Sequence, residues 1–224
     1  MISVVIPALN EEVNIGRCIA ALRSTDPSCE VIVADGGSRD RTREVAESCT
    51  GVACIRAEKG RGNQMNAGAS HTRGDVLLFL HADTILTAGW DREIESALGD
   101  KRVAGGTFTF AIDNPLRKYR MIEAWVSMRC RVFGLPYGDQ AIFVRRDVFD
   151  ALKGYKNIPL MEDVDLIRRM KRRGRIALLE QKALTSGRRW AAKGLIRTAA
   201  VNQIIMLLYL LGVSPHRLAK FYYR

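Results

Sequence analysis

The sequence lacks the patterns of several common classes of site. It has three histidines and no CxxC pair among its five cysteines, which argues against a zinc site. No GxGxxG follows the first predicted strand, so a nicotinamide dinucleotide site is disfavoured. The most apolar segment, Ile204–Val213, has about half of the roughly 20 residues that a membrane-spanning helix needs.

Two further absences concern location. The first residues contain no basic stretch ahead of an apolar one, so no signal peptide is predicted. The cysteines are odd in number and scattered, which is typical of reduced thiols and predicts a cytoplasmic protein.

Acidic residues are scarce in the last quarter of the chain. Residues 166–224 hold 14 of the 35 Lys and Arg side chains but only one acidic residue, Glu180. Such a basic segment favours an anionic partner, which could be a phosphate-bearing substrate, a membrane surface or nucleic acid. A solvated helix face explains the charge as well. The apolar segment and the basic, aromatic residues after it suit a membrane interface, a subunit contact or packing against the core.

Strand-like and helix-like segments alternate through the first hundred residues. The order predicts an α/β fold, with a parallel sheet covered by helices on both faces. The expected strands are Ile2–Leu9, Glu30–Ala34, Val52–Arg56 and Val76–Leu80, and the expected helices are Asn10–Leu22, Ser38–Ser48, Gly62–His71 and Trp90–Leu98. Beyond Asp100 the pattern predicts strands at Gly105–Ile112, Gln140–Phe149 and Ile176–Leu184, a helix at Glu162–Arg173, a helix or an excursion over the active face at Pro115–Phe133, and helices from Ala191 onward.

The apolar run Val76–Leu80 ends in His81-Ala82-Asp83. A carboxylate at the C-terminal tip of a buried parallel strand lies where open α/β sheets bind ligands. Asp83 could therefore hold a divalent cation, which could in turn hold a diphosphate. The other explanation is that Asp83 caps the next helix.

Three more polar loops are expected at the same edge of the sheet. They follow the first three strands, at Pro7–Glu12, Asp35–Asp40 and Lys59–Asn63. Lys59 and Arg61 can contact phosphate, and a helix N-terminus at Gly62 adds a favourable dipole. Each loop alone is weak evidence for a ligand site, because polar residues are common in turns. Four polar loops at matching strand ends are harder to explain as ordinary turns.

Together these segments resemble the family 2 glycosyltransferases, which are of the GT-A type. The resemblance covers residues 1 to about 190 and rests on Val4–Glu11, Val33–Thr42, His81-Ala82-Asp83 and Met161–Asp165. It implies a Rossmann-like, mostly parallel sheet flanked by helices. It also implies a catalytic domain over residues 1–190, with a nucleotide-binding half in 1–100 and an acceptor-binding half in 101–190. Residues 191–224 would form a basic and apolar helical extension, and the whole chain looks like the small, soluble bacterial members.

The resemblance implies an inverting, metal-dependent transfer of a sugar from a nucleotide-diphospho-sugar, usually a UDP-sugar, to a hydroxyl acceptor. Asp83 matches the metal ligand of the family's DxD motif, and His81, in place of the first Asp, is the less certain ligand. The metal would be Mn²⁺ or Mg²⁺, and imidazole suits Mn²⁺ better. Asp163 matches the general base.

The resemblance also implies which residues contact the substrates. The implied nucleotide contacts are Pro7, Ala8, Asn10, Glu11, Asp35, Arg61 and Asn66. The implied donor and acceptor contacts are Gly105, Gly106, Asp139, Gln140, Glu162, Arg188, Arg189 and Trp190.

The sequence does not identify the acceptor. The basic, aromatic tail is compatible with a lipid-linked acceptor, with peripheral contact with the inner face of a membrane and with a homodimer. Nucleic acid is not expected as a partner. A nucleotidyltransferase is the first alternative, but it would need a Gly-rich loop with Arg and Lys after the first strand, which Pro7–Glu12 lacks. The second alternative is a non-catalytic module that binds a membrane or nucleic acid. Such a module does not require carboxylates at the strand ends, so it leaves them unexplained.

Overall fold

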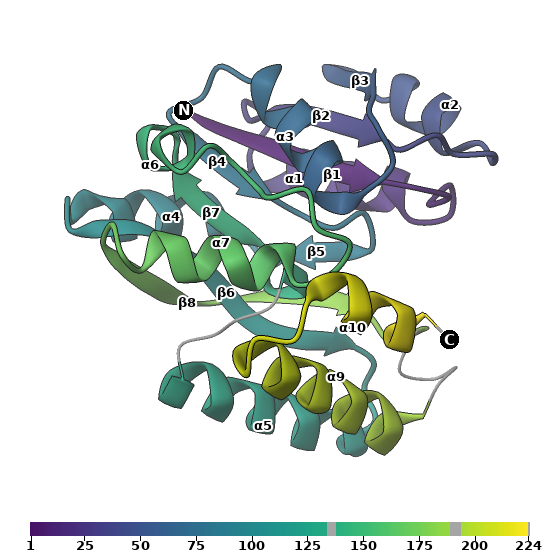
Figure 1. Ribbon diagram of the computed structural model, residues 1–224. Helices are drawn as coiled ribbons and strands as arrows, with labels where there is room; N and C mark the ends of the chain where they lie inside the picture. The colour runs from purple at the N-terminus through teal and green to yellow at the C-terminus, as the bar shows by residue number, and fades with distance from the viewer. Residues whose placement is uncertain (134–137, 189–193, 224) are drawn as a thin grey trace.

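An eight-stranded sheet forms the centre of the computed structural model, which describes residues 1–133, 138–188 and 194–223 (Figure 1). The strand order is β3-β2-β1-β4-β7-β6-β8-β5. Six strands run in one direction, while β7 and β5 are antiparallel to their neighbours. The predicted α/β fold with a mostly parallel sheet is thus confirmed. The strands are β1 (Ile2–Ala8), β2 (Glu30–Asp35), β3 (Val52–Arg56), β4 (Val76–Phe79), β5 (Thr84–Leu86), β6 (Val103–Asp113), β7 (Ile142–Arg145) and β8 (Arg175–Ser186).

Helices cover both faces of the sheet, and each face has its own apolar cluster. On one face, β1, β2 and β4 contribute side chains that pack with α1 (Ile15–Thr25), α2 (Thr42–Glu47) and α4 (Trp90–Gly99). On the other face, side chains of β4 and β7 pack with α3 (Arg61–Ser70), α6 (Arg146–Ala151) and α7 (Glu162–Met170). The remaining elements are α5 (Arg117–Phe133), the 3₁₀ helix η1 (Gly138–Gln140), α9 (Leu195–Leu210) and α10 (Pro215–Tyr222).

The first two helices begin later than the sequence pattern predicts. Helix α1 starts at Ile15, because Asn10 has a positive φ of 57° and the carbonyl of Glu11 closes a turn onto Asn14 and Ile15. Helix α2 starts at Thr42 rather than Ser38. Both shifts lengthen the polar loops that follow β1 and β2.

The structure corrects two other expectations. The residues after Asp83 form the short strand β5, which pairs antiparallel with β8, so the helix-cap explanation of Asp83 is wrong. The predicted strand Gln140–Phe149 is strand only from Ile142 to Arg145, and the chain then enters α6.

Gly105 and Gly106 lie inside β6, where a strand was predicted, but they do not line the larger cavity, so their implied contact with the donor or acceptor is corrected. Both are buried, and Gly105 pairs with Val144, which on its other side pairs with Leu77 near the start of β4. The two glycines therefore lie toward the edge of the sheet opposite Asp83. A Cβ on Gly105 would meet the carbonyl oxygen of Phe143 and would lie 2.5 Å from Cε of Met170, so the close approach of strands explains the glycine.

The C-terminal helices pack against the start of α7. Ile205, Met206, Leu218 and Ala219 form an apolar cluster with Leu160, Met161 and Val164. Packing against the rest of the fold thus accounts for one side of the apolar segment Ile204–Val213. In the part of the chain that the structure describes, no helix has both the length and the hydropathy required to cross a bilayer.

The tight packing at Gly105 predicts that Gly105→Ala destabilises the protein by about 1–3 kcal/mol, because the added methyl group meets backbone that cannot move aside. Urea unfolding followed by circular dichroism measures this change. Gly99→Ala is the matched control, since Gly99 is helical and exposed and a Cβ there would meet nothing within 4 Å. An equal loss of stability in both variants would contradict the packing argument.

Candidate functional site

One edge of the sheet collects loops from distant parts of the sequence. The C-terminal ends of β1, β4 and β8 meet there, and the segment before β7 joins them because β7 runs in the opposite direction. A cavity of about 850 Å³ lies at this edge, between the strand ends, the start of α7 and the two C-terminal helices. Predicted site residues that line it are Pro7, Ala8, Glu11, Arg61, His81, Asp83, Asp139, Glu162 and Asp163.

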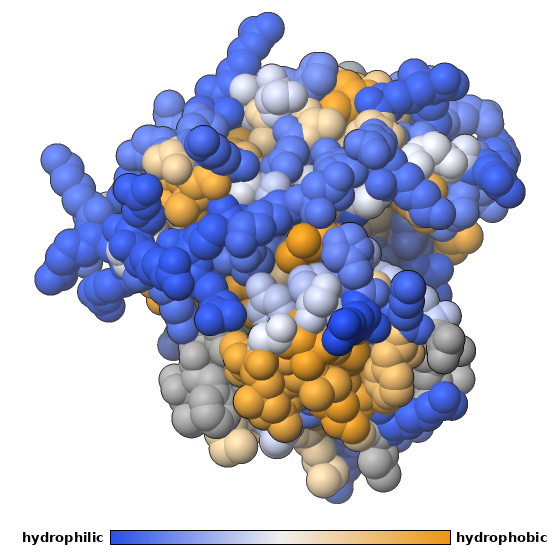
Figure 2. All heavy atoms as spheres, viewed as in Figure 1, coloured by the Kyte–Doolittle hydropathy of each residue, from blue (hydrophilic) through white to orange (hydrophobic). Residues whose placement is uncertain are grey.

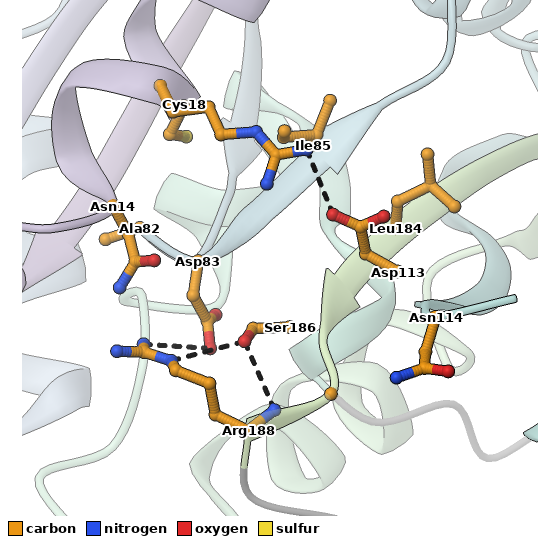
Figure 3. A pocket seen from close by; sticks show the side chains of 12 residues that line it. Asn14, Cys18, Ala82, Asp83, Ile85, Asp113, Asn114, Leu184, Ser186 and Arg188 are labelled. Carbon is orange, nitrogen blue, oxygen red and sulfur yellow. Dashed lines mark hydrogen bonds and ion pairs between the residues drawn. The ribbon is translucent and has the colours of Figure 1, made fainter. Parts of the chain in front are cut away.

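Asp83 lies between the tip of β4 and the start of β5, next to a second acid and an arginine. Nη2 of Arg188 is 3.2 Å from Oε2 of Glu11 and 3.9 Å from Oδ2 of Asp83. Burial raises the pKa of Asp83 and the charge of Glu11 raises it further, while Arg188 lowers it. Figure 3 shows Arg188 reaching toward Asp83 and Ser186 in a second cavity of about 390 Å³, which shares Ala82, Asp83 and Ser186 with the first.

Asp163 projects into the larger cavity from the first turn of α7. Its Oδ2 accepts a hydrogen bond from the backbone N–H of Gly138, and its Oδ1 accepts one from the N–H of Val164 at 2.7 Å. A Cβ on Gly138 would be 3.0 Å from Oδ2 of Asp163 and 3.4 Å from Nε2 of His81. The absence of a side chain at position 138 therefore leaves room for both groups at one point of the cavity wall.

Glu162 is held by an arginine from the other half of the sheet. Its side chain is 4% exposed, and its Oε1 is 3.3 Å from Nη1 of Arg61 at the start of α3. Burial and the neighbouring Asp163 raise the pKa of Glu162, and Arg61 partly offsets this. This ion pair joins the start of α3 to the start of α7.

Beside the cavity, Asn10 links the loops after β1 and β2, and Asp35 orders the second of these loops. The backbone N–H of Asn10 donates to Oγ of Ser38, and its Oδ1 accepts from the N–H of Arg39, each at 2.9 Å. The buried carboxylate of Asp35 accepts from the N–H groups of Gly37 and Ser38 at 3.2 Å and from the Ser38 hydroxyl at 2.5 Å. Neither side chain is part of the wall of the larger cavity.

Two predicted contacts are corrected by their hydrogen bonds. The side-chain amide of Asn66 donates to the carbonyl of Tyr155 and accepts from its N–H, each at 2.8 Å, so it ties α3 to the loop after α6. Gln140 is buried, and its amide donates to the carbonyl of Phe108 at 3.1 Å. Both amides hold the protein together instead of facing the cavity. Arg189 and Trp190 lie outside the described residues.

Several residues of the site were missed from the sequence. Gln64 is buried at the edge of the sheet, and its amide donates to the carbonyls of Ala8 and Ala34, at 2.8 and 2.9 Å. A single Gln within the predicted helix Gly62–His71 belongs to no motif that would mark it as a site residue. The cavity wall also includes side chains from α9 and from the end of the chain, for which no local motif exists: Thr198, Asn202, Ile205, Tyr222 and Tyr223.

Of the side chains that line the larger cavity, Asp83, Glu11 and His81 follow the ends of β1 and β4 and have the chemistry to hold a cation. Among the described residues, no three His, Cys, Asp or Glu side chains are grouped closely enough to form a metal site by themselves. Hard divalent cations take about six ligands, mostly oxygen, so a bound anion would have to complete the shell.

Comparisons with known proteins show which proteins this chain resembles. Residues 3–157 match the family described as Glycosyl transferase family 2. The undecaprenyl-phosphate 4-deoxy-4-formamido-L-arabinose transferase of Pseudomonas paraeruginosa is 35% identical over 166 residues, which are 68% of this chain and 49% of that protein. Glycosyltransferase AglE of Haloferax volcanii is 27% identical over 171 residues, which are 70% and 56% of the two chains. The chain thus spans about half the length of these relatives.

Solved structures share the fold at low sequence identity. A glucosyl-3-phosphoglycerate synthase from Mycobacterium tuberculosis, in complex with Mn²⁺, UDP and glucosyl-3-phosphoglycerate, has a TM-score of 0.65 at 20% identity and covers 93% of this chain and 79% of its own. S. aureus TarS in complex with UDP-GlcNAc has a TM-score of 0.62 at 16% identity, with coverage of 82% and 58%. Since the family match extends over more than half of the chain and a relative of 35% identity covers two thirds of it, this protein belongs to glycosyl transferase family 2.

Proposed function

We propose that this protein transfers a sugar from a UDP-sugar to an acceptor hydroxyl, with a divalent metal and with inversion at the anomeric carbon. The observation that supports this proposal is that Asp83, at a strand end, and Asp163, at a helix start, line the same cavity. One carboxylate can bind the metal of the donor diphosphate while the other receives the acceptor's proton.

Residues 1–100 are proposed to bind the nucleotide and residues 101–190 the acceptor, with 191–224 as an extension that adds to the cavity wall. Pro7, Ala8 and Glu11 follow β1, and Arg61 can meet a phosphate at the start of α3. UDP as the nucleotide is supported by the two structural neighbours, which were crystallised with UDP or UDP-GlcNAc.

The charges around Asp83 fit a divalent cation. Burial, and after it the charge of Glu11, raises the pKa of Asp83, and Arg188 alone among the described residues forms an ion pair with both acids. A carboxylate with a nearby imidazole suits Mn²⁺, and Mg²⁺ would rely on the carboxylate. We propose Asp83 as the direct ligand and His81 as a weaker one. When bound, the metal would neutralise charge on the departing diphosphate.

Asp163 is proposed as the general base. The N–H groups of Gly138 and Val164 hold its carboxylate in place in the first turn of α7. A carboxylate held there can accept the proton of an acceptor hydroxyl as the new glycosidic bond forms. A single displacement from the side opposite the leaving group inverts the anomeric centre.

A lipid-linked acceptor, used at the cytoplasmic face of a membrane, is proposed for the same site. The support is the undecaprenyl phosphate in the name of the Pseudomonas relative and the apolar part of the cavity wall. That part is formed by Ile158, Pro159, Leu160, Met161 and Ile205.

Asp83→Asn is expected to weaken Mn²⁺-dependent UDP binding at least about tenfold, because the amide is a poor ligand for a hard cation. Its thermal stability should not fall, since the change removes the repulsion with Glu11. Titration calorimetry with UDP, with and without Mn²⁺, measures the first effect, and a thermal melt measures the second. Asp113→Asn is the control, because Asp113 lines the smaller cavity and pairs with the exposed Arg17. Unchanged metal dependence in Asp83→Asn would remove Asp83 as ligand.

Asp163→Asn is expected to keep UDP affinity within about threefold and to slow transfer by about 10²–10⁴-fold, the usual contribution of a general base. The assay is transfer or donor hydrolysis, with the donor chosen by a thermal-shift screen of nucleotide sugars with and without Mn²⁺. Asp147→Asn, at an exposed acid in the first turn of α6, is the matched control. Turnover close to the unmodified protein in Asp163→Asn would exclude this residue as the base.

A further inference from the structure

Helix α9 is apolar on two sides, and only one of them is covered. Ile205 and Met206 are buried against the start of α7. On the solvent side, Ile204, Leu207 and Leu211 are 48, 58 and 72% exposed. Their spacing of three and four residues places them along one stripe of the helix. Figure 2 shows an apolar patch over α9.

The neighbouring helices continue this exposure. Helix α5 lies beside α9, where Ala199 packs against a cluster that includes Tyr119 and Val126 (Figure 1). Large apolar side chains are exposed on α5 at Met121, Trp125 and Met128, and at the end of the chain at Phe221 and Tyr223. Single exposed apolar residues are ordinary, but a set gathered on neighbouring helices marks an interaction surface. We name the exposed sides of α5, α9 and α10 the apolar–basic face.

The charges of this face are of one sign. Residues 194–224 contain no Asp or Glu, while Arg197, Arg217 and Lys220 are exposed. The one acid of α5, Glu123, accepts from the N–H of Ile112 at 2.6 Å and pairs with Arg120 at 2.9 Å, so it is already bonded within the protein. The face therefore combines exposed apolar side chains with an excess of exposed basic ones.

We propose that the apolar–basic face binds the surface of an anionic bilayer. Apolar side chains that enter the headgroup region, together with basic ones that meet anionic lipids, are the features of an interfacial helix. The 16 residues of α9 extend about 24 Å, less than the roughly 30 Å hydrocarbon core, so the helix lies on the bilayer. A second copy fits the charges poorly, because a two-fold contact through this face would bring basic residues against basic residues.

This surface adjoins the proposed site. Thr198, Asn202 and Ile205 of α9 and Tyr222 and Tyr223 at the end of the chain line the larger cavity. On the proposed function, docking would place the cavity beside the headgroups, where a lipid-linked acceptor could reach Asp163 without leaving the bilayer. The docking itself is measured without donor or acceptor, so it and the proposed function can fail separately.

Sedimentation with vesicles tests the proposal on the full chain. Vesicles of phosphatidylcholine with about one third phosphatidylglycerol should bind the protein, and vesicles of phosphatidylcholine alone should bind it much more weakly. Binding should fall as the salt concentration rises from about 0.1 to about 1 M, because screening weakens the attraction of the basic side chains.

Variants locate the binding surface. Leu207→Glu with Leu211→Glu should weaken vesicle partition at least about tenfold, because charged side chains replace those that enter the bilayer. Arg217→Gln with Lys220→Gln should weaken it about fivefold per residue and reduce its salt dependence. Val13→Glu is the matched control, since it puts the same charge on another exposed apolar residue, 77% exposed before α1. Circular dichroism and Mn²⁺-dependent UDP binding show whether each variant keeps its fold.

Three results would overturn the proposal. The first is no binding of the unmodified protein to anionic vesicles at low salt, and the second is an equal loss of binding in Val13→Glu. The third is a dimer, seen in sedimentation velocity, that the Leu207 and Leu211 changes abolish, combined with no binding to vesicles. In that case the face would be a contact between two copies of the protein. Vesicle binding that persists in a protein without affinity for UDP would refute only the proposed function.

Discussion

Crowding of negative charge at one edge of the sheet is the constraint on which the site depends. Glu11, Asp83, Glu162 and Asp163 line one cavity, and two arginines hold three of them. Arg61 comes from the first half of the chain and Arg188 from beyond the last strand of the sheet. Each arginine bonds an acid far away in sequence, so the charges are balanced only when the whole sheet has formed. Carboxylates partly withdrawn from water and incompletely neutralised are costly, which favours the binding of a cation there.

Most of the acidic positions could be predicted from the sequence, because each follows a local pattern. Asp83 ends an apolar run, and Glu162 and Asp163 begin an amphipathic helix. The reversal of β7 and β5 could not be predicted in this way, since strand direction depends on pairings across 60 residues or more, as between Val76 and Arg145 or Thr84 and Thr185.

The errors have physical causes as well. A pair of glycines allows the backbone to approach either a ligand or another strand, and in β6 it permits the close approach of strands. An amide can bind a ligand or a backbone group with the same atoms, so Asn66 and Gln140 could not be told apart from binding residues. The apolar segment of α9 shows the same ambiguity, because a helix that is apolar all round does not indicate which side meets the core. Only the packing of Ile205 and Met206 resolves it.

The position of Tyr223 in the cavity wall has a practical consequence for labelling. A group attached at Tyr223 would lie beside the cavity. Polypeptide fused before Met1 would leave from the opposite edge of the sheet, where the N-terminal amine lies 3.4 Å from Asp75 (Figure 1). A purification tag attached at the N-terminus thus leaves the cavity open. A fluorophore attached at Tyr223 would instead report on molecules that enter the cavity.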